Sequence, residues 1–157
     1  MRILGIDPGL AIVGYAILDC QSNDRFELIS SGSIQTMQQD CESKRLLEIF
    51  EDLDSLMKKY KPDVVGIEKL FYFKNQKTVM AVSQARGVIL AAIEKNKVPI
   101  FEYTPIEIKQ TITGFGRAQK EEVKKFVNLS IELADIKLDD TIDAIAIAIC
   151  HARNIIF

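Results

Sequence analysis

Short apolar segments separated by turn residues and polar links open the chain, a pattern typical of β-strands. An apolar strand is predicted over Arg2–Asp7, and Pro8-Gly9 ends it with a turn. Two more strand-like segments, Gly14–Leu18 and Phe26–Gln35, follow after short polar links. Three consecutive strands with short connections predict an antiparallel meander.

After this meander the hydrophobic period becomes helical. An amphipathic helix is indicated by regularly spaced apolar residues, namely Leu46, Ile49, Phe50, Leu53, Leu56, Met57 and Tyr60. The pattern then predicts a short buried strand, a long helix, a second short strand and two helical segments. Their ranges are Val64–Ile67, Gln76–Asn96, Val98–Tyr103, the region around Lys109, and Gln119–Leu133, where Val123, Phe126, Val127 and Ile131 make one face.

The last segment, residues 140–154, carries two competing patterns. Ile145, Ile147 and Ile149 alternate as in a strand, but an alanine-rich run of this length without a turn signal favours a helix. With a helix here, the order of elements predicts an α/β fold. We expect a mixed five-stranded sheet with helices on both faces, in a single domain over residues 1–157.

Composition limits the class of protein. No stretch approaches the roughly 20 apolar residues of a membrane-spanning helix, and the N-terminus lacks a signal-peptide pattern, so we expect a cytoplasmic protein. Cys20, Cys41 and Cys150 have no C-x-x-C spacing and indicate reduced thiols, not disulfides or a zinc site. The net charge of −2 does not by itself indicate nucleic-acid binding, so the local distribution of charge has to decide.

Carboxylates stand at the ends of two predicted buried strands. Asp7 precedes Pro8-Gly9, where glycine permits close approach by a phosphate group, and Glu68 follows Val64–Ile67. Taken alone, Asp7 is explained more simply as a turn cap and Glu68 as a surface residue. Neighbouring strand ends meet in α/β sheets, however, and ligand sites form there.

Asp140 and Asp143 lie three residues apart at the start of the last predicted helix and therefore share one face. A helix N-cap explains Asp139 or Asp140 well. It explains Asp143 poorly, because Ala144 and Ile145 beside it belong to the apolar part of the helix.

Four carboxylates that converge repel one another, and bound divalent cations relieve this repulsion. Oxygen ligands select magnesium, with manganese as a substitute, and two such ions about 4 Å apart stabilise the attacking and leaving oxygens of a phosphoryl displacement. The sequence therefore predicts a magnesium-dependent nuclease whose catalytic and metal-binding residues are Asp7, Glu68, Asp140 and Asp143. His151, the single histidine, is interpreted as structural or exposed.

The acids stand within a series of short motifs: Ile3–Gly9 with Gly14, Gly66-Ile67-Glu68, Lys74-Asn75, Gln84–Gly87, Tyr103-Thr104-Pro105, Lys109-Gln110, Gly114, and Asp140-x-x-Asp143-Ala144. In this order, and over nearly the whole chain, the motifs resemble those of the RuvC family of Holliday-junction resolvases. The resemblance implies a ribonuclease H-like fold and a homodimer that makes paired symmetrical nicks in four-way junction DNA during recombination and repair. It also implies cooperation with the RuvA and RuvB branch-migration proteins, catalysis by the four acids, and DNA-binding roles for Phe71, Lys109 and Lys120.

Two groups of residues suit a DNA-binding surface. Lys69, Lys74 and Lys77 surround Phe71-Tyr72-Phe73, and rings beside cations suit unpaired bases. Which of the three rings contacts a base is open, and a hydrophobic loop tucked into the core is the alternative. The second group surrounds Gly114-Phe115-Gly116 and consists of Lys109, Arg117, Lys120, Lys124 and Lys125, for which solvated lysines at a helix break are the alternative.

The predicted helix Gln76–Asn96 carries large apolar residues on more than one face: Val79, Met80, Val82, Val88, Ile89, Leu90 and Ile93. One face can cover the sheet, and the other suits a twofold dimer unless the monomer buries both.

Other classes of protein fit parts of this sequence. Sugar kinases, actin and Hsp70 chaperones also open with a strand, an Asp-x-Gly turn and a second strand, but an ATPase of that class needs a second such domain and a second phosphate loop, which 157 residues do not hold. The intact acid set argues against an inactive junction-binding module. Another ribonuclease H-like nuclease or a transposase core is an open alternative.

Overall fold

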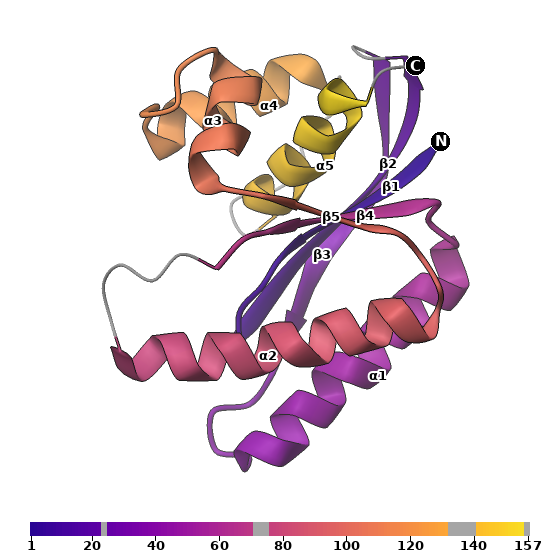
Figure 1. Ribbon diagram of the computed structural model, residues 1–157, viewed down its shortest axis with the longest axis vertical. Helices are drawn as coiled ribbons and strands as arrows, with labels where there is room; N and C mark the ends of the chain where they lie inside the picture. Colours follow the sequence, from indigo (N-terminus) through magenta and orange to yellow (C-terminus); the bar gives the residue numbers. More distant parts are fainter. Residues whose placement is uncertain (23–24, 71–75, 132–140, 156–157) are drawn as a thin grey trace.

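Strand β1 (Arg2–Asp7) lies in the middle of a five-stranded sheet, as its apolar run predicts. The computed structural model describes residues 1–22, 25–70, 76–131 and 141–155. Around β1 the strand order is β3-β2-β1-β4-β5 (Figure 1), with β2 spanning Ile12–Ser22, β3 Arg25–Gln35, β4 Val64–Glu68 and β5 Ile100–Tyr103. The β1–β2 and β2–β3 pairs are antiparallel, whereas β1–β4 and β4–β5 are parallel. The predicted meander and mixed sheet are confirmed.

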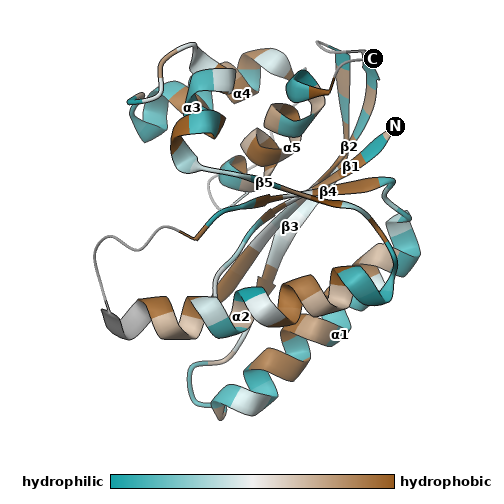
Figure 2. Cartoon of the chain, in the orientation of Figure 1, coloured by the Kyte–Doolittle hydropathy of each residue, from teal (hydrophilic) through white to brown (hydrophobic). Residues whose placement is uncertain are grey.

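Helices cover both faces of this sheet (Figure 1). One face packs against α1 (Glu42–Tyr60) and α2 (Gln76–Lys95), and the other against α3 (Pro105–Thr113), α4 (Lys120–Ser130) and α5 (Ile142–Asn154). Successive residues of β1 alternate between the two cores, because side chains along a strand point to opposite faces. Ile3 joins the core under α5, and Leu4 and Ile6 join the core under α1 and α2. The same division appears in Figure 2, where β4 is strongly hydrophobic and α1 alternates hydrophobic and hydrophilic positions.

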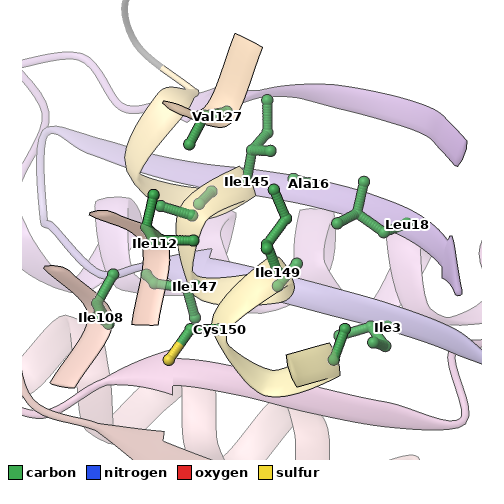
Figure 3. Close-up of a cluster of buried hydrophobic side chains, with 14 of the residues drawn as sticks. Ile3, Ala16, Leu18, Ile108, Ile112, Val127, Ile145, Ile147, Ile149 and Cys150 are labelled. Atoms are coloured by element: carbon green, nitrogen blue, oxygen red, sulfur yellow. The ribbon is translucent and has the colours of Figure 1, made fainter. Parts of the chain in front are cut away.

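Helix α5 explains why the end of the sequence carries two patterns. Every residue from 144 to 150 is buried, so the helix is apolar all round and shows no single stripe. Ile145, Ile147 and Ile149 point into one cluster with Val127 of α4 and Ile112 of α3 (Figure 3). The expected helix is confirmed, and the strand-like alternation reflects burial on several sides.

Some boundaries and faces differ from those predicted. The N-cap of α5 is Thr141, whereas Asp139 and Asp140 lie outside the described residues. In α4, Phe126 is 41% exposed, so it does not share the buried face of Val123 and Val127.

The apolar residues of α2 are divided between the core of the monomer and the surface. Ile89 and Ile93 are fully buried in the core of the monomer, and Val88 and Leu90 pack partly against the same core. Met80, by contrast, is 70% exposed. Most of the large apolar residues of α2 therefore stabilise the monomer, and Met80 is the residue of this helix that a partner surface could cover.

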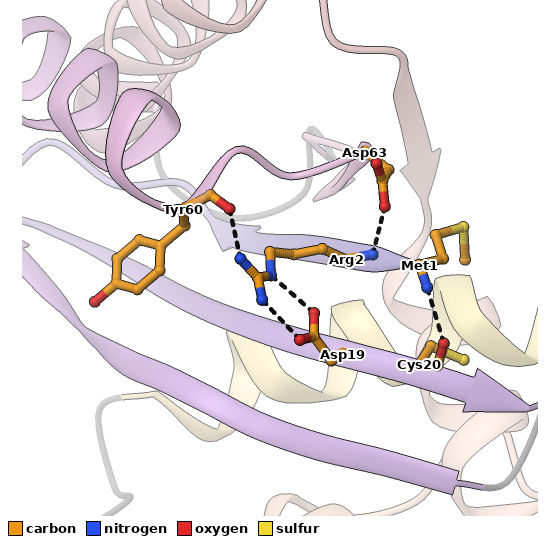
Figure 4. A network of polar contacts seen from close by, with 6 residues as sticks. All are labelled: Met1, Arg2, Asp19, Cys20, Tyr60 and Asp63. Atoms are coloured by element: carbon orange, nitrogen blue, oxygen red, sulfur yellow. Dashed lines mark hydrogen bonds and ion pairs between the residues drawn. The ribbon is translucent and has the colours of Figure 1, made fainter.

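Arg2 ties the start of β1 to its surroundings (Figure 4). Its guanidinium donates Nε and Nη2 to the two carboxylate oxygens of Asp19 on β2, at 2.8 and 2.7 Å, and donates Nη1 to the carbonyl of Tyr60. Its backbone N–H donates to Asp63, just before β4. The network holds β1, β2 and the α1–β4 connection in register at the end of β1 opposite Asp7.

All three cysteines are free thiols, with Cys20 and Cys150 buried and Cys41 exposed. Among the helices within the described ranges, none combines the length and the apolar character that a membrane crossing requires.

Candidate active site

Two of the predicted acids leave the sheet side by side. Ile6 of β1 pairs in parallel register with Ile67 of β4, and Asp7 and Glu68 are the next residues of their strands. On their other sides, Asp7 pairs with Gly14 of β2 and Glu68 with Tyr103 of β5. The two carboxylates therefore stand on neighbouring central strands, at the same edge of the sheet.

A pair of glycines lets α5 bring a third acid to this edge. Gly5 and Gly66 are partners in the β1–β4 register. A Cβ atom at Gly5 would lie 2.1 Å from the carbonyl oxygen of Ala144 and 2.9 Å from Cβ of Ala148, so the backbone of α5 rests directly on β1. Asp143 precedes Ala144 and is thereby held above the strand ends.

This pair of glycines was not singled out by the sequence analysis. Its signal is present in the sequence, because a glycine stands two positions before each strand-end acid: Gly5 before Asp7 and Gly66 before Glu68. The spacing predicts a close contact between helix and sheet only when the two strands are known to pair in register and an alanine-rich helix is known to cross them.

The carboxylates perturb one another electrostatically. Burial, followed by the charge of Asp143, raises the pKa of Asp7 to about 6, against the opposing effect of Lys120. Burial, followed by the charges of Asp7 and Asp143, raises the pKa of Glu68 to about 7, against the opposing effect of Lys109. Asp7, Glu68 and Asp143 thus form one interacting group of negative charges, of the kind that marks functional sites.

Two of the predicted DNA-binding lysines line the same cleft as Glu68 and Asp143. The cleft has a volume of about 220 Å³, and Nζ of Lys120 lies 3.4 Å from Oδ2 of Asp143. Its remaining lining is mostly apolar and consists of Pro105, Ile108, Val123, Ala146 and Ile147. The cleft therefore joins acids and cations over an apolar floor.

Capped helices present the two lysines. Thr104 and Glu107 form a reciprocal capping box at the start of α3, in which Glu107 N–H donates to Oγ1 of Thr104 and Thr104 N–H donates to Oε2 of Glu107. Lys109 follows in this helix, and Lys120 is the first residue of α4, after Gln119 at its N-cap. Both cations are therefore carried by helices with capped N-termini.

The donor chemistry of this site fits a hard divalent cation. Its acids supply oxygen ligands only, and burial together with the neighbouring carboxylates disfavours the charged forms of Asp7 and Glu68, which a bound cation would stabilise. Within the described part of the chain, Asp7, Glu68 and Asp143 do not close into a group of three ligands. Asp140, the predicted fourth ligand, lies outside the described residues. The catalytic and metal-binding roles stay predictions.

Three further residues with predicted contacts to DNA or to a phosphate group are Phe71, Lys74 and Gly9. Phe71 and Lys74 lie outside the described residues. Gly9, expected to admit a phosphate, is required by its own turn, because a Cβ atom there would lie 2.3 Å from the carbonyl oxygen of Ile12.

His151 is structural, in agreement with one of its two predicted readings. It is 2% exposed, its Nδ1 lies 2.6 Å from the hydroxyl of Tyr103, and its ring centroid is 4.6 Å from that of Phe101. Burial lowers the pKa of His151, so the imidazole stays neutral at physiological pH. The contact fixes the last turns of α5 against β5.

The raised pKa of Asp7 predicts how folding stability depends on pH. Because the folded protein binds this proton more tightly than the unfolded chain, stability is lost as pH rises through the window from the ordinary value near 4 to about 6. Without divalent metal, Asp7→Asn should therefore have a higher Tm than the parent chain at pH 8, and the difference should shrink toward pH 4. Calorimetry in EDTA measures both curves, and subtracting them cancels the titration of His151. An equal or lower Tm of Asp7→Asn at pH 8 would contradict the assigned electrostatics.

Comparisons with known proteins agree on one family. The family model described as crossover junction endodeoxyribonuclease RuvC matches residues 3–151. Curated relatives of that name include one from Caldicellulosiruptor saccharolyticus, 45% identical over 96% of this chain and 92% of its own length. Another, from Petrotoga mobilis, is 47% identical over 98% of this chain and 94% of its own length.

Solved structures match the fold over nearly the full chain. T. thermophilus RuvC in complex with a Holliday junction substrate has a TM-score of 0.91 at 28% identity, covering 97% of this chain and 93% of its own. The yeast mitochondrial Holliday junction resolvase Ydc2 has a TM-score of 0.70 at 16% identity, covering 97% and 79%, which is a likeness of fold alone. The predicted ribonuclease H-like fold is confirmed.

Proposed function

Because the chain belongs to the RuvC family of crossover junction endodeoxyribonucleases, we propose that it resolves four-way DNA junctions by paired symmetrical nicks in recombination and repair. The observation that carries this proposal is the grouping of Asp7, Glu68 and Asp143 with two lysines at one edge of the sheet. Residues 1–157 act as a single nuclease domain.

In the proposed mechanism the acids work as one charged set. Asp7, Glu68, Asp140 and Asp143 would hold two magnesium ions, or manganese in their place, which supply positive charge for the attacking and leaving oxygens of the phosphodiester. The carboxylates have to be deprotonated for this role, and the pKa of Glu68, about 7, means that it competes with protons near neutral pH. Activity should accordingly fall on acidification.

Lys109 and Lys120 bind the phosphates of the DNA backbone in this proposal. Their contact with the cleft supports the role, and each opposes the raised pKa of one acid, Lys109 at Glu68 and Lys120 at Asp7. Phe71, assigned by resemblance, and Lys74, assigned as one of the cations around the aromatic triplet, are proposed to contact the DNA as well.

The twofold symmetry of a four-way junction supports a homodimer, since two equivalent strands have to be cut and one acid cluster makes one nick. Met80 on α2 is the large exposed apolar residue that such an interface can cover. We expect Met80→Glu to convert a dimer into a folded monomer, whereas Ile89→Glu should unfold the chain because Ile89 is fully buried. Sedimentation and circular dichroism distinguish the two. A parent chain that stays monomeric at micromolar concentration on junction DNA would refute the dimer.

RuvA and RuvB are the proposed protein partners, and the cytoplasm is the proposed compartment. Both follow from the family, and the free cysteines suit a reducing compartment.

The decisive experiment compares labelled four-way junction, fork and duplex DNA, with and without magnesium. Symmetrical nicks confined to the junction and dependent on magnesium are the expected result. Equal cutting of all three substrates would favour another ribonuclease H-like nuclease. Binding and hydrolysis of ATP without DNA cleavage would favour the actin-like or Hsp70-like alternative.

A further inference from the structure

The connection between α3 and α4 displays an aromatic side chain to solvent. Phe115 is 60% exposed, and Ile106, against which the neighbouring Gly116 packs, is 64% exposed. Arg117, also exposed, follows two residues later. Two large apolar side chains beside a cation form a surface that the fold itself does not use.

The backbone that carries Phe115 is braced from both sides. The side-chain amide of Gln110 donates to the carbonyl of Gly114 at 2.7 Å and accepts from Gly116 N–H at 2.9 Å. Oγ1 of Thr113 accepts from Phe115 N–H at 3.1 Å. Gly114 has a φ of 80°, a left-handed conformation that glycine adopts without strain.

The far side of the loop is anchored as well. Ala118, which is buried, donates its N–H to the carbonyl of Phe115 at 3.0 Å. The exposed ring therefore stands on a fixed support, and little conformational entropy is lost when a ligand contacts it.

This loop joins the two helices that deliver lysines to the acid cleft. Lys109 of α3 precedes the bracing residue Gln110, and Lys120 opens α4. In Figure 1 the α3–α4 connection projects to the upper left, and β4, which ends in Glu68, also ends toward the left of the view. The aromatic surface is thus continuous in the chain with the proposed phosphate-binding residues.

The chemistry of the loop selects its occupant. A flat exposed ring on a loop that Lys109 precedes, and that Arg117 and Lys120 follow, suits nucleic acid, because a base face can stack on the ring while the phosphates meet the cations. In a paired and stacked duplex the face of a base is covered by its neighbours, so the ring requires a base that is unpaired or unstacked. Four-way junctions supply such bases at the point of strand exchange.

We propose that Phe115 stacks on an unpaired base of the junction, as a second aromatic contact separate from Phe71. The proposal rests on the proposed junction-resolving function. It assigns the α3–α4 loop a role in selecting distorted DNA, and it assigns Gln110 and Thr113 the role of positioning residues that hold the loop.

The test measures binding of the full chain in EDTA, so that no cleavage occurs, to a four-way junction carrying 2-aminopurine at the exchange point and to a matched duplex. Phe115→Ala and Phe115→Leu should weaken junction binding on the order of tenfold and lose the quenching that stacking causes, while Phe115→Trp keeps both. Duplex binding should be unchanged. Phe126→Ala, which removes another exposed phenylalanine from α4, is the matched control and should behave like the parent chain.

Three results would overturn the proposal. They are junction binding by Phe115→Ala equal to that of the parent, junction binding by Phe115→Leu equal to that of the parent, and an equal fall of junction and duplex affinity. Each of them removes stacking on an unpaired base as the explanation. Thermal unfolding of each variant excludes loss of fold. If the parent chain itself neither prefers nor cuts the junction, the proposed function fails, and that outcome is separate from the failure of the Phe115 contact.

Discussion

Asp7→Asn is expected to lower junction cleavage by orders of magnitude while junction binding survives. The asparagine keeps the size of the side chain but removes a charge that the proposed mechanism needs at the strand ends. Asp7 is the acid whose strand lies in the middle of the sheet, next to Glu68 on β4 and below Asp143 on α5. Glu68→Gln should have the same phenotype for the same reason.

Single-turnover cleavage in magnesium and equilibrium binding in EDTA separate the two effects. Asp52→Asn is the matched control, because Asp52 is exposed on α1, on the opposite face of the sheet from α5. It should cleave like the parent chain. Near-parental cleavage by Asp7→Asn would refute the assignment of the acids, and loss of junction binding by that variant would show that the carboxylate acts in binding or folding.

The fold was largely predictable because its elements differ in hydrophobic period. Short apolar segments with short polar links identified the β1–β3 meander, and helical spacing identified α1, where the predicted residues Ile49, Leu53 and Met57 are buried. Periodicity failed where burial is not one-sided. In α5 it could not separate strand from helix, and length and composition had to decide.

Periodicity also could not say which neighbour buries an apolar residue. The apolar residues of α2 are spread around the helix, which predicted a partner, yet the sheet and α1 bury Ile89 and Ile93 within the monomer. Likewise, Phe126 was grouped with Val123 and Val127 by spacing but is exposed. These outcomes depend on the distance and angle between packed elements, which the sequence does not state locally.

The candidate site was predictable where it depends on local position. Asp7 and Glu68 stand at the carboxyl ends of buried strands, and parallel pairing of those strands is enough to bring them together. The position of Asp143 depends on how closely α5 packs on the sheet. Gly5 and Gly66 allow that close packing because they have no side chain, and for the same reason they carry no chemical signal of their own in the sequence.

Gly5→Ala should therefore damage both folding and catalysis. The new methyl group would lie 2.1 Å from the backbone carbonyl of Ala144, and a backbone atom of a buried helix cannot rotate away as a side chain can. Either α5 or β1 has to move, and overpacking of this kind costs about 1–3 kcal/mol or more. Because Asp143 adjoins Ala144, the same movement displaces an acid, and a shift of about 1 Å can reduce catalysis roughly 100-fold.

Alanine substitutions at two other glycines should have smaller effects and serve as comparisons. Gly66→Ala should destabilise the chain less than Gly5→Ala, because the nearest contact of its new Cβ is the Cγ2 methyl of Ile147 at 3.2 Å. Gly87→Ala on α2 meets nothing within 4 Å and should stabilise the chain by about 0.5–1 kcal/mol. Urea denaturation gives the order of stability, and cleavage is measured at a temperature at which every variant is folded. A folded Gly5→Ala variant with parental cleavage would show that Asp143 does not depend on the contact between α5 and β1. Equal stability of the Gly5 and Gly87 variants would contradict the close packing itself.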